Sequence, residues 1–120
     1  MTPRAQSRKH RGYATQRLIA ERWRQNGMAP YAKAAGAGES GKDILDVIGL
    51  SVEIKARDTM SLPACLRQAR ASADIDDIPI AICRHNGQGE AQVGQFTVSM
   101  DLADFEVLWV MANEDPMEDW

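Results

Sequence analysis

The chain has 120 residues, of which 44% are hydrophobic and 26% are charged, and this is the length and composition of one ordinary globular domain. Its apolar stretches are too short to cross a membrane, and no apolar run of signal-peptide type follows the basic N-terminus. Neither a membrane protein nor a secreted protein is therefore expected. The two cysteines, Cys65 and Cys83, have no metal-ligand spacing and are predicted to be buried core residues.

Charge is distributed unevenly along the chain, although the net charge is only −3. Residues 1–26 contain seven lysines and arginines and one acid, whereas residues 101–120 contain seven acids and no base. This asymmetry indicates an electropositive face that suits phosphates and an acidic end that turns away from them. We expect a flexible basic arm at 1–11, a single domain at 12–112 and an acidic tail at 113–120.

The first half of the chain is predicted to contain one helix followed by strands. Asn26-Gly27 is a typical helix stop, and Ile19 and Trp23 belong to the apolar side of the helix before it. Tyr31 is expected in the strand that follows. The predicted elements are a helix at 12–26, a strand at 28–35, a glycine-rich loop at 36–41, and strands at 43–47 and 50–56.

The second half begins with a helix for which Ser61 is the expected N-cap. A turn containing His85, which is expected to be exposed, separates two strands. Asp101 is the expected N-cap of a final helix, whose apolar residues, Trp109 among them, are predicted to pack in the core. The predicted elements are a helix at 61–73, strands at 78–84 and 93–99, and a helix from 101. The whole order is α-β-β-β-α-β-β-α, which is typical of a mixed α/β domain.

Glu53 and Lys55 are the most informative residues of the sequence. Successive side chains of a strand alternate between its faces, so both project from one face of the strand at 50–56. Asp43 and Asp46 lie on the preceding strand, and either of them can bring a second carboxylate near Glu53. They face opposite sides of a regular strand, so both do not serve together without a bulge. We favour Asp43 because it directly follows Gly41-Lys42.

Two carboxylates that converge on one point, with backbone carbonyls and water, suit Mg²⁺. Such a metal polarises a phosphodiester and lowers the pKa of a bound water. The Lys55 ammonium is suited to orienting that water or to neutralising charge on the phosphorane-like transition state. The glycine-rich loop before Asp43 would let a phosphate backbone pass closely.

Gly41-Lys42-Asp43-Ile44, followed by Glu53-Ile54-Lys55, resembles the metal motif of the PD-(D/E)XK nucleases. The order of elements resembles archaeal-type Holliday-junction resolvases and their small phage relatives. The resemblance implies a restriction-endonuclease-like fold, in which helices flank a mixed central sheet. It implies Mg²⁺, with Mn²⁺ as a substitute, bound by Asp43, Glu53 and the backbone carbonyl of Ile54, and it implies that Lys55 is catalytic.

The resemblance also implies a homodimer that cuts branched DNA, since a four-way junction needs two symmetric cuts. We expect the protein in the cytoplasm, which is that of the bacterial host if a phage encodes it. A nicking or mismatch endonuclease of the same fold is an alternative. So is a non-catalytic module that binds DNA or protein.

The first helix departs from the pattern of these resolvases. They carry a glutamate that contributes to the metal site four residues after a Lys/Arg-Gly pair. Here Gln16 stands at that offset from Arg11-Gly12, and we assign it to the catalytic site. Glu21 is a less favoured candidate, because it lies beside Arg17 and Arg24, where a surface ion pair is expected.

Several basic and polar residues are predicted to contact DNA. They flank the motif, belong to the basic N-terminal region, or lie on the helix that follows the motif. These candidates are Arg8, Lys9, Arg11, Gly38, Ser40, Lys42, Arg57 and Gln68.

Overall fold

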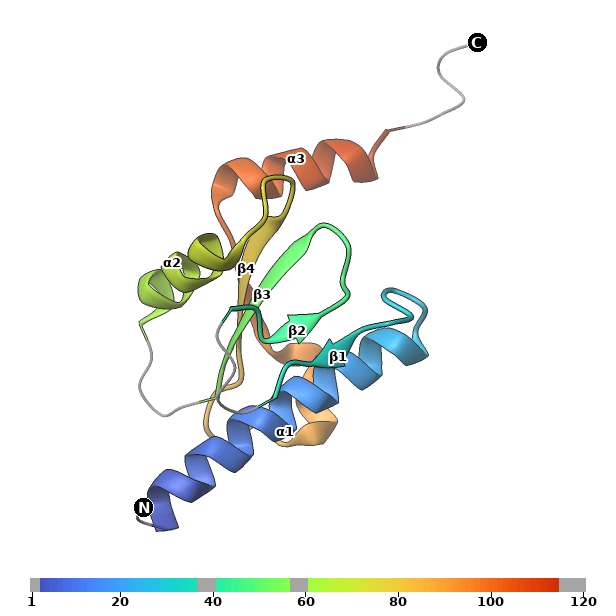
Figure 1. The fold of residues 1–120 in the computed structure, drawn as a ribbon. Helices are drawn as coiled ribbons and strands as arrows, with labels where there is room; N and C mark the ends of the chain where they lie inside the picture. The colour runs from blue at the N-terminus through green and yellow to red at the C-terminus, as the bar shows by residue number, and fades with distance from the viewer. Residues whose placement is uncertain (1–2, 37–40, 57–60, 115–120) are drawn as a thin grey trace.

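A computed structural model describes residues 3–36, 41–56 and 61–114, and it describes side chains from residue 11 onward. The elements follow one another as a long helix, three strands, a helix, a strand, a 3₁₀ helix, a strand and a last helix (Figure 1). They are α1 (Pro3–Gln25), β1 (Lys33–Ala34), β2 (Ile44–Leu45), β3 (Leu50–Lys55), α2 (Leu62–Ser72), β4 (Ile78–Cys83), η1 (Glu90–Gln95), β5 (Thr97–Ser99) and α3 (Leu102–Ala112).

The strands form one five-stranded mixed sheet in the order β1-β2-β3-β4-β5. β3 and β4 are parallel, which requires the crossover that α2 provides, and all other neighbours are antiparallel. The long central pair keeps its register from Leu50 opposite Ile78 to Lys55 opposite Cys83. The protein is therefore an α/β domain with a mixed sheet, as its sequence predicts.

The two faces of the central strands are covered by different helices. Val52 and Ile54 of β3 belong to one apolar cluster with Ile19 and Trp23 of α1. Ser51, on the other face, donates a 3.0 Å hydrogen bond to a main-chain carbonyl of α2. Because side chains alternate along a strand, Glu53 and Lys55 share the α2 face with Ser51.

Helix α2 begins as predicted. The Ser61 hydroxyl accepts a 3.3 Å hydrogen bond from the Ala64 N–H, and Pro63 lies in the first turn, where its missing N–H leaves no bond unmade. Cys65 of this helix and Cys83 of β4 are both buried, as expected. In the described part of the chain, no helix is long and apolar enough to cross a membrane.

Four predicted boundaries are wrong. The strand expected at 43–47 is only β2, because the chain at Asp46 has a φ of 62° and is no longer extended. The first helix begins at Pro3 rather than at residue 12, so the part of the expected arm that the structure describes is helical. The strand expected at 28–35 is only β1, because the Ala29 N–H bonds the Trp23 carbonyl and the chain turns back on the end of α1. Tyr31 therefore lies outside any strand and is 80% exposed.

The strand expected at 93–99 begins only at Thr97, and η1 occupies the residues before it. The side chain of Gln92 accepts a 2.6 Å hydrogen bond from the Gly89 N–H, which closes a tight turn at the start of η1. Side chain to main chain bonds of this kind compete with an extended strand.

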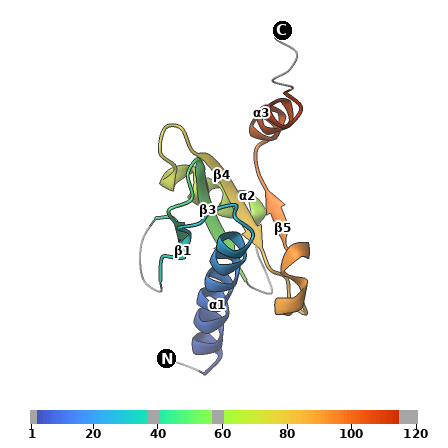
Figure 2. The ribbon, with the colours of Figure 1, turned by 90° about the vertical axis from the view of Figure 1, so that its right-hand side faces the viewer.

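The last helix is the largest departure from the sequence prediction. α3 has no buried residue, and Trp109, which was expected in the core, is 61% exposed. Asp101 lies at the N-cap position, but its carboxylate bonds Arg70 of α2 instead of an N–H of α3. Figure 2 shows α3 beyond the end of β5 and apart from the other helices.

Candidate active site

Glu53 and Lys55 lie side by side on β3, as strand alternation predicts. The Lys55 Nζ atom is 3.6 Å from Glu53 Oε1, and the two side chains are 19% and 11% exposed. Their partners in the neighbouring strand are Ala81 and Cys83. The carboxylate and the ammonium are thus held on a rigid central strand, with small side chains beside them.

Asp43 joins this pair just before β2 begins. Its N–H donates to the Val52 carbonyl at 2.8 Å, and its Oδ2 atom accepts the Ile54 N–H at 2.7 Å. The main chain and the side chain of Asp43 are therefore both hydrogen-bonded to β3. Its carboxylate lies close enough to Glu53 to raise the pKa of that residue.

Asp46 occupies a different place. It lies in the connection after β2, is exposed, and has a φ of 62°, a conformation that residues with a side chain seldom adopt. It lines a groove with Lys33 and Ile48. The structure therefore brings Asp43 to Glu53 and leaves Asp46 away from the pair.

The site contains two carboxyl groups and one ammonium group, and the two carboxyl groups have shifted pKa values. Burial and the Asp43 carboxylate together raise the pKa of Glu53 to about 7, although the charge of Lys55 acts in the opposite direction. Burial also raises the pKa of Asp43, against the Ile54 N–H and Lys55, which lower it. Two buried or half-buried carboxylates thus face one ammonium, and a cation bound between them would relieve the repulsion.

The backbone of Ile54 is directed toward the same place. The carbonyl of the next residue, Lys55, accepts the N–H of Arg84 on the β4 side. The N–H and C=O of Ile54 therefore point to the opposite side, where Asp43 lies. Carboxylate and carbonyl oxygens are the ligands that Mg²⁺ prefers, so this donor set fits the metal expected from the sequence.

Gln16 is not among the side chains that contact the two carboxylates. It lies on the side of α1 that carries Ile19 and Trp23, and that side packs on the face of the sheet opposite to Glu53. Its Oε1 atom is buried and has no hydrogen-bond partner in the described part of the chain. The catalytic role that the sequence suggests for Gln16 stays a prediction.

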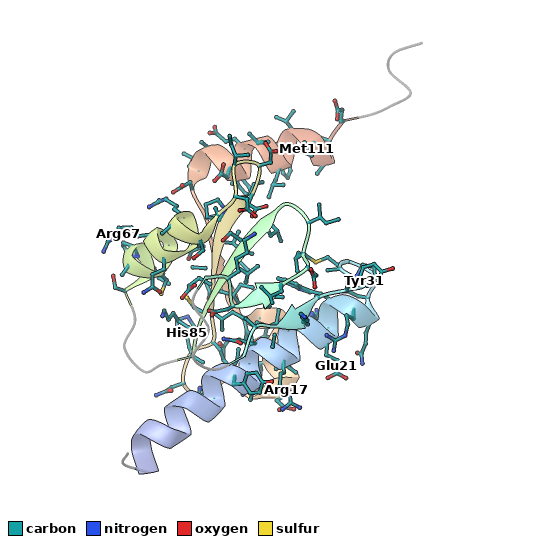
Figure 3. The ribbon with its side chains drawn as sticks, in the orientation of Figure 1. Arg17, Glu21, Tyr31, Arg67, His85 and Met111 are labelled. Atoms are coloured by element: carbon teal, nitrogen blue, oxygen red, sulfur yellow. The ribbon has the colours of Figure 1, made fainter. Side chains whose placement is uncertain are left out.

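Glu21 lies outside the site. It is exposed, and Figure 3 shows it on the side of α1 away from the strands. Its carboxylate accepts a 3.2 Å hydrogen bond from Gln25 instead of pairing with the neighbouring arginines. Arg17 lies over the Tyr13 ring, and Arg24 donates to the Ala32 carbonyl, so the expected ion pair is wrong.

Lys42 and Arg11, two of the expected DNA contacts, are engaged within the protein. Lys42 Nζ lies 3.0 Å from Asp74 and 2.6 Å from Asp77, which ties the chain before Asp43 to the loop between α2 and β4. Arg11 donates a 2.8 Å hydrogen bond to the His85 carbonyl. The Arg11 guanidinium and the Lys42 ammonium are therefore only partly available to bind a phosphate.

Of the other residues that are expected to contact DNA, the structure describes the side chain of only one. Gln68 lies on α2 and is exposed. The remaining candidates lie outside the described residues or outside the described side chains. These are Arg8, Lys9, Gly38, Ser40 and Arg57.

Sequence reasoning missed Arg84, which directly follows β4. It is 7% exposed, and its guanidinium donates to Thr15 Oγ1 at 3.0 Å and to the Gln88 carbonyl at 2.8 Å. It also lies over the Phe96 ring, 5.5 Å from the centroid. Arg84 thus joins α1 to the strand end beside Lys55. An arginine at the end of an apolar strand was the only signal for it.

Among the described residues, no group of three or more histidine, cysteine and acidic side chains is placed to hold a metal. The candidate ligands are two carboxylates and a carbonyl. Comparison of the chain with family models, curated proteins and solved structures finds no match. The resemblance to the PD-(D/E)XK nucleases is carried by the sequence motif Gly41-Lys42-Asp43-Ile44 and Glu53-Ile54-Lys55.

Proposed function

We propose that the protein is a Mg²⁺-dependent DNA endonuclease of the PD-(D/E)XK class with a restriction-endonuclease-like fold. The observation that carries the proposal is the contact between Asp43 and the Ile54 N–H at 2.7 Å. It fixes a carboxylate from one strand beside the Glu53–Lys55 pair of the next. An antiparallel β2–β3 pair followed by a parallel β3–β4 crossover supports the same fold.

Each residue of the site has its own role in the proposed chemistry. Asp43, Glu53 and the Ile54 carbonyl would hold Mg²⁺, which when bound supplies a Lewis acid for the scissile phosphate and lowers the pKa of a bound water. Lys55 keeps its ammonium beside the reacting phosphate, where it orients the attacking water or neutralises transition-state charge. β3 fixes the spacing of these groups before substrate arrives.

Branched DNA, and a four-way junction in particular, is the proposed substrate. The excess of bases in residues 1–26 supports a DNA partner, since phosphate contacts account for most of the affinity in such complexes. One domain with one site cuts one strand, so two symmetric cuts call for a homodimer. We place this activity in the cytoplasm, which is that of the bacterial host if a phage encodes the protein.

A cleavage panel tests the proposal. Four-way junction, flap, nicked and linear duplex DNA are each incubated with the protein and Mg²⁺ or Mn²⁺. We expect junction cleavage by the wild type, loss with Asp43→Asn, Glu53→Gln and Lys55→Met, and retention with the control Asp46→Asn. Preferential cutting of nicked or mismatched duplex would favour the alternative endonucleases. Equal activity of the wild type and the three site variants would refute the assignment.

A non-catalytic DNA-binding module is the second candidate. Gln16 in place of a helix glutamate favours it, because the site has only two carboxylates among the described residues. This candidate predicts salt-dependent DNA binding without a metal requirement. Calorimetric Mg²⁺ or Mn²⁺ binding that disappears in Glu53→Gln would contradict it.

A further inference from the structure

The apolar surface of α3 is larger than a free helix end requires. Val107 and Trp109 project to nearly opposite sides, about 160° apart, because they are two residues apart in a helix. A helix that is apolar all round is normally buried. Its exposed large apolar residues are Leu102, Phe105, Val107, Leu108, Trp109, Val110 and Met111.

A groove of about 350 Å³ lies near the start of α3, between α2 and β5. Leu62, Pro63 and Leu66 form its apolar wall, and Arg67 and Arg70 form its charged rim. The Asp101 carboxylate is bonded to Arg70 in two places, which fixes the N-cap of α3 at this rim. Helix α3 runs away from α2 (Figure 1), and no α3 residue lines the groove, so the helix and the groove are both uncovered in one chain.

The charges of the two surfaces are complementary. α3 carries Asp104 and Glu106 and no base, whereas the rim carries arginines only. Asp104 already acts on Arg70 of the same chain. Glu106 and Arg67 have no ion-pair partner within the described part of the chain, and Figure 3 shows Arg67 on the outer side of α2.

We propose that α3 of one copy docks into the α2–β5 groove of a second copy, and the reverse, so that the chain forms a two-fold homodimer by exchange of α3. A single groove covers only one side of α3, and the α3 of the other copy covers the opposite side. A second copy therefore covers the apolar surface of α3, fills the groove and pairs the opposite charges of the two surfaces. This interface rests on these surfaces and not on the proposed nuclease activity.

The first test is the mass of the protein in solution over a concentration series, measured by light scattering after size exclusion. We expect a dimer, and we expect Trp109→Glu to weaken it roughly 30-fold or more, as loss of a central aromatic anchor does. Ile75→Glu is the matched control, because Ile75 is 99% exposed, lies outside α3 and does not line the groove. A monomeric wild type, or a dimer that Trp109→Glu does not weaken, would overturn the proposal.

A charge-swap experiment tests the groove itself. Arg67→Glu alone and Glu106→Lys alone each place like charges in both halves of a homodimer, so each should dissociate more readily than the wild type. Mixing the two variants restores opposite charges in both halves, so the mixture should form heterodimers with near wild-type affinity. If the mixture is no tighter than either variant, α3 does not dock in this groove. Circular dichroism of each variant confirms that it is folded.

Discussion

The Ile54 N–H donates to the Asp43 carboxylate at 2.7 Å, and this bond joins the two strands of the site through the centre of the Glu53-Ile54-Lys55 motif. The donor is a backbone group, so the bond does not depend on the side chain at position 54. The carboxylate is held at one oxygen. The other oxygen stays available for a ligand. One oxygen of Asp43 thus holds the two strand segments together, and the other can bind a metal.

Asp43→Asn should therefore preserve the fold and remove the chemistry. The asparagine Oδ1 atom can accept the same N–H bond, but a neutral amide binds Mg²⁺ more weakly than a carboxylate does. We expect a melting temperature close to that of the wild type and cleavage reduced at least about 100-fold. Single-turnover cleavage and thermal melting check these two outcomes. A large drop in melting temperature would mean that the charge, and not only the bond, supports the fold.

Glu53→Gln should make the metal-free protein more stable. The pKa of Glu53 is raised to about 7 in the folded protein from 4.5, so its stabilising contribution is present below about pH 4.5 and lost as the pH rises to 7. The free energy of unfolding of the wild type should fall by about 1–3 kcal/mol across this window.

Glutamine does not titrate, so the Glu53→Gln variant should lose less stability over the same range and melt several degrees higher at pH 8. Thermal melts in EDTA from pH 4.5 to 8 measure this difference, and Asp46→Asn is the control. If the two pH profiles are parallel, the raised pKa of Glu53 is wrong. Mg²⁺ should restore the stability of the wild type at pH 8 and leave Glu53→Gln unchanged.

Lys42 should matter for stability rather than for DNA binding. Its ammonium pairs with Asp77 at 2.6 Å, and Asp77 is 11% exposed. We expect Lys42→Met to cost about 1 kcal/mol, and the double variant with Asp77→Asn to cost less than the sum of the single variants. The slope of log affinity against log salt for DNA should not change. A slope smaller by about one would instead restore Lys42 as a phosphate contact.

Arg84→Met should weaken the attachment of α1 to the sheet. The Arg84 side chain is buried and donates to Thr15 Oγ1 and the Gln88 carbonyl, so its removal takes a donor from both, and the buried Thr15 hydroxyl keeps only its bond to the Arg11 carbonyl. We expect a loss of about 2–3 kcal/mol, which Arg84→Lys does not recover because lysine has no planar fork. Chemical denaturation measures both variants. A loss below about 1 kcal/mol in both would show that the link is dispensable.

The parts of the fold that follow from local rules could be predicted from the sequence. Strand alternation placed Glu53 and Lys55 on one face, and Ser61 marked the start of α2. The neighbouring glycine and lysine favoured Asp43 over Asp46, and the structure brings Asp43 near Glu53. These signals succeed because each depends on residues a few positions apart.

The parts that failed depend on distant partners. Lys42 finds its acids more than thirty positions along the chain, and no local pattern reveals that pairing. The apolar residues of α3 were predicted to pack in the core, but the structure leaves them exposed, because periodicity does not say which surface an apolar helix contacts. Arg84 was missed because its partners lie on α1 and in the turn after β4.

The core packing of β3 has a consequence for the fidelity of the site. Val52 and Ile54 are buried against α1, and Glu53 is the residue between them. A slip of one position in this strand would place an acid in the apolar core and two aliphatic side chains at the site. Such a misaligned sheet would not be stable, so a molecule that folds has already aligned its acidic and basic groups. Loss of activity in a folded population should therefore report damage to individual groups and not errors of strand pairing.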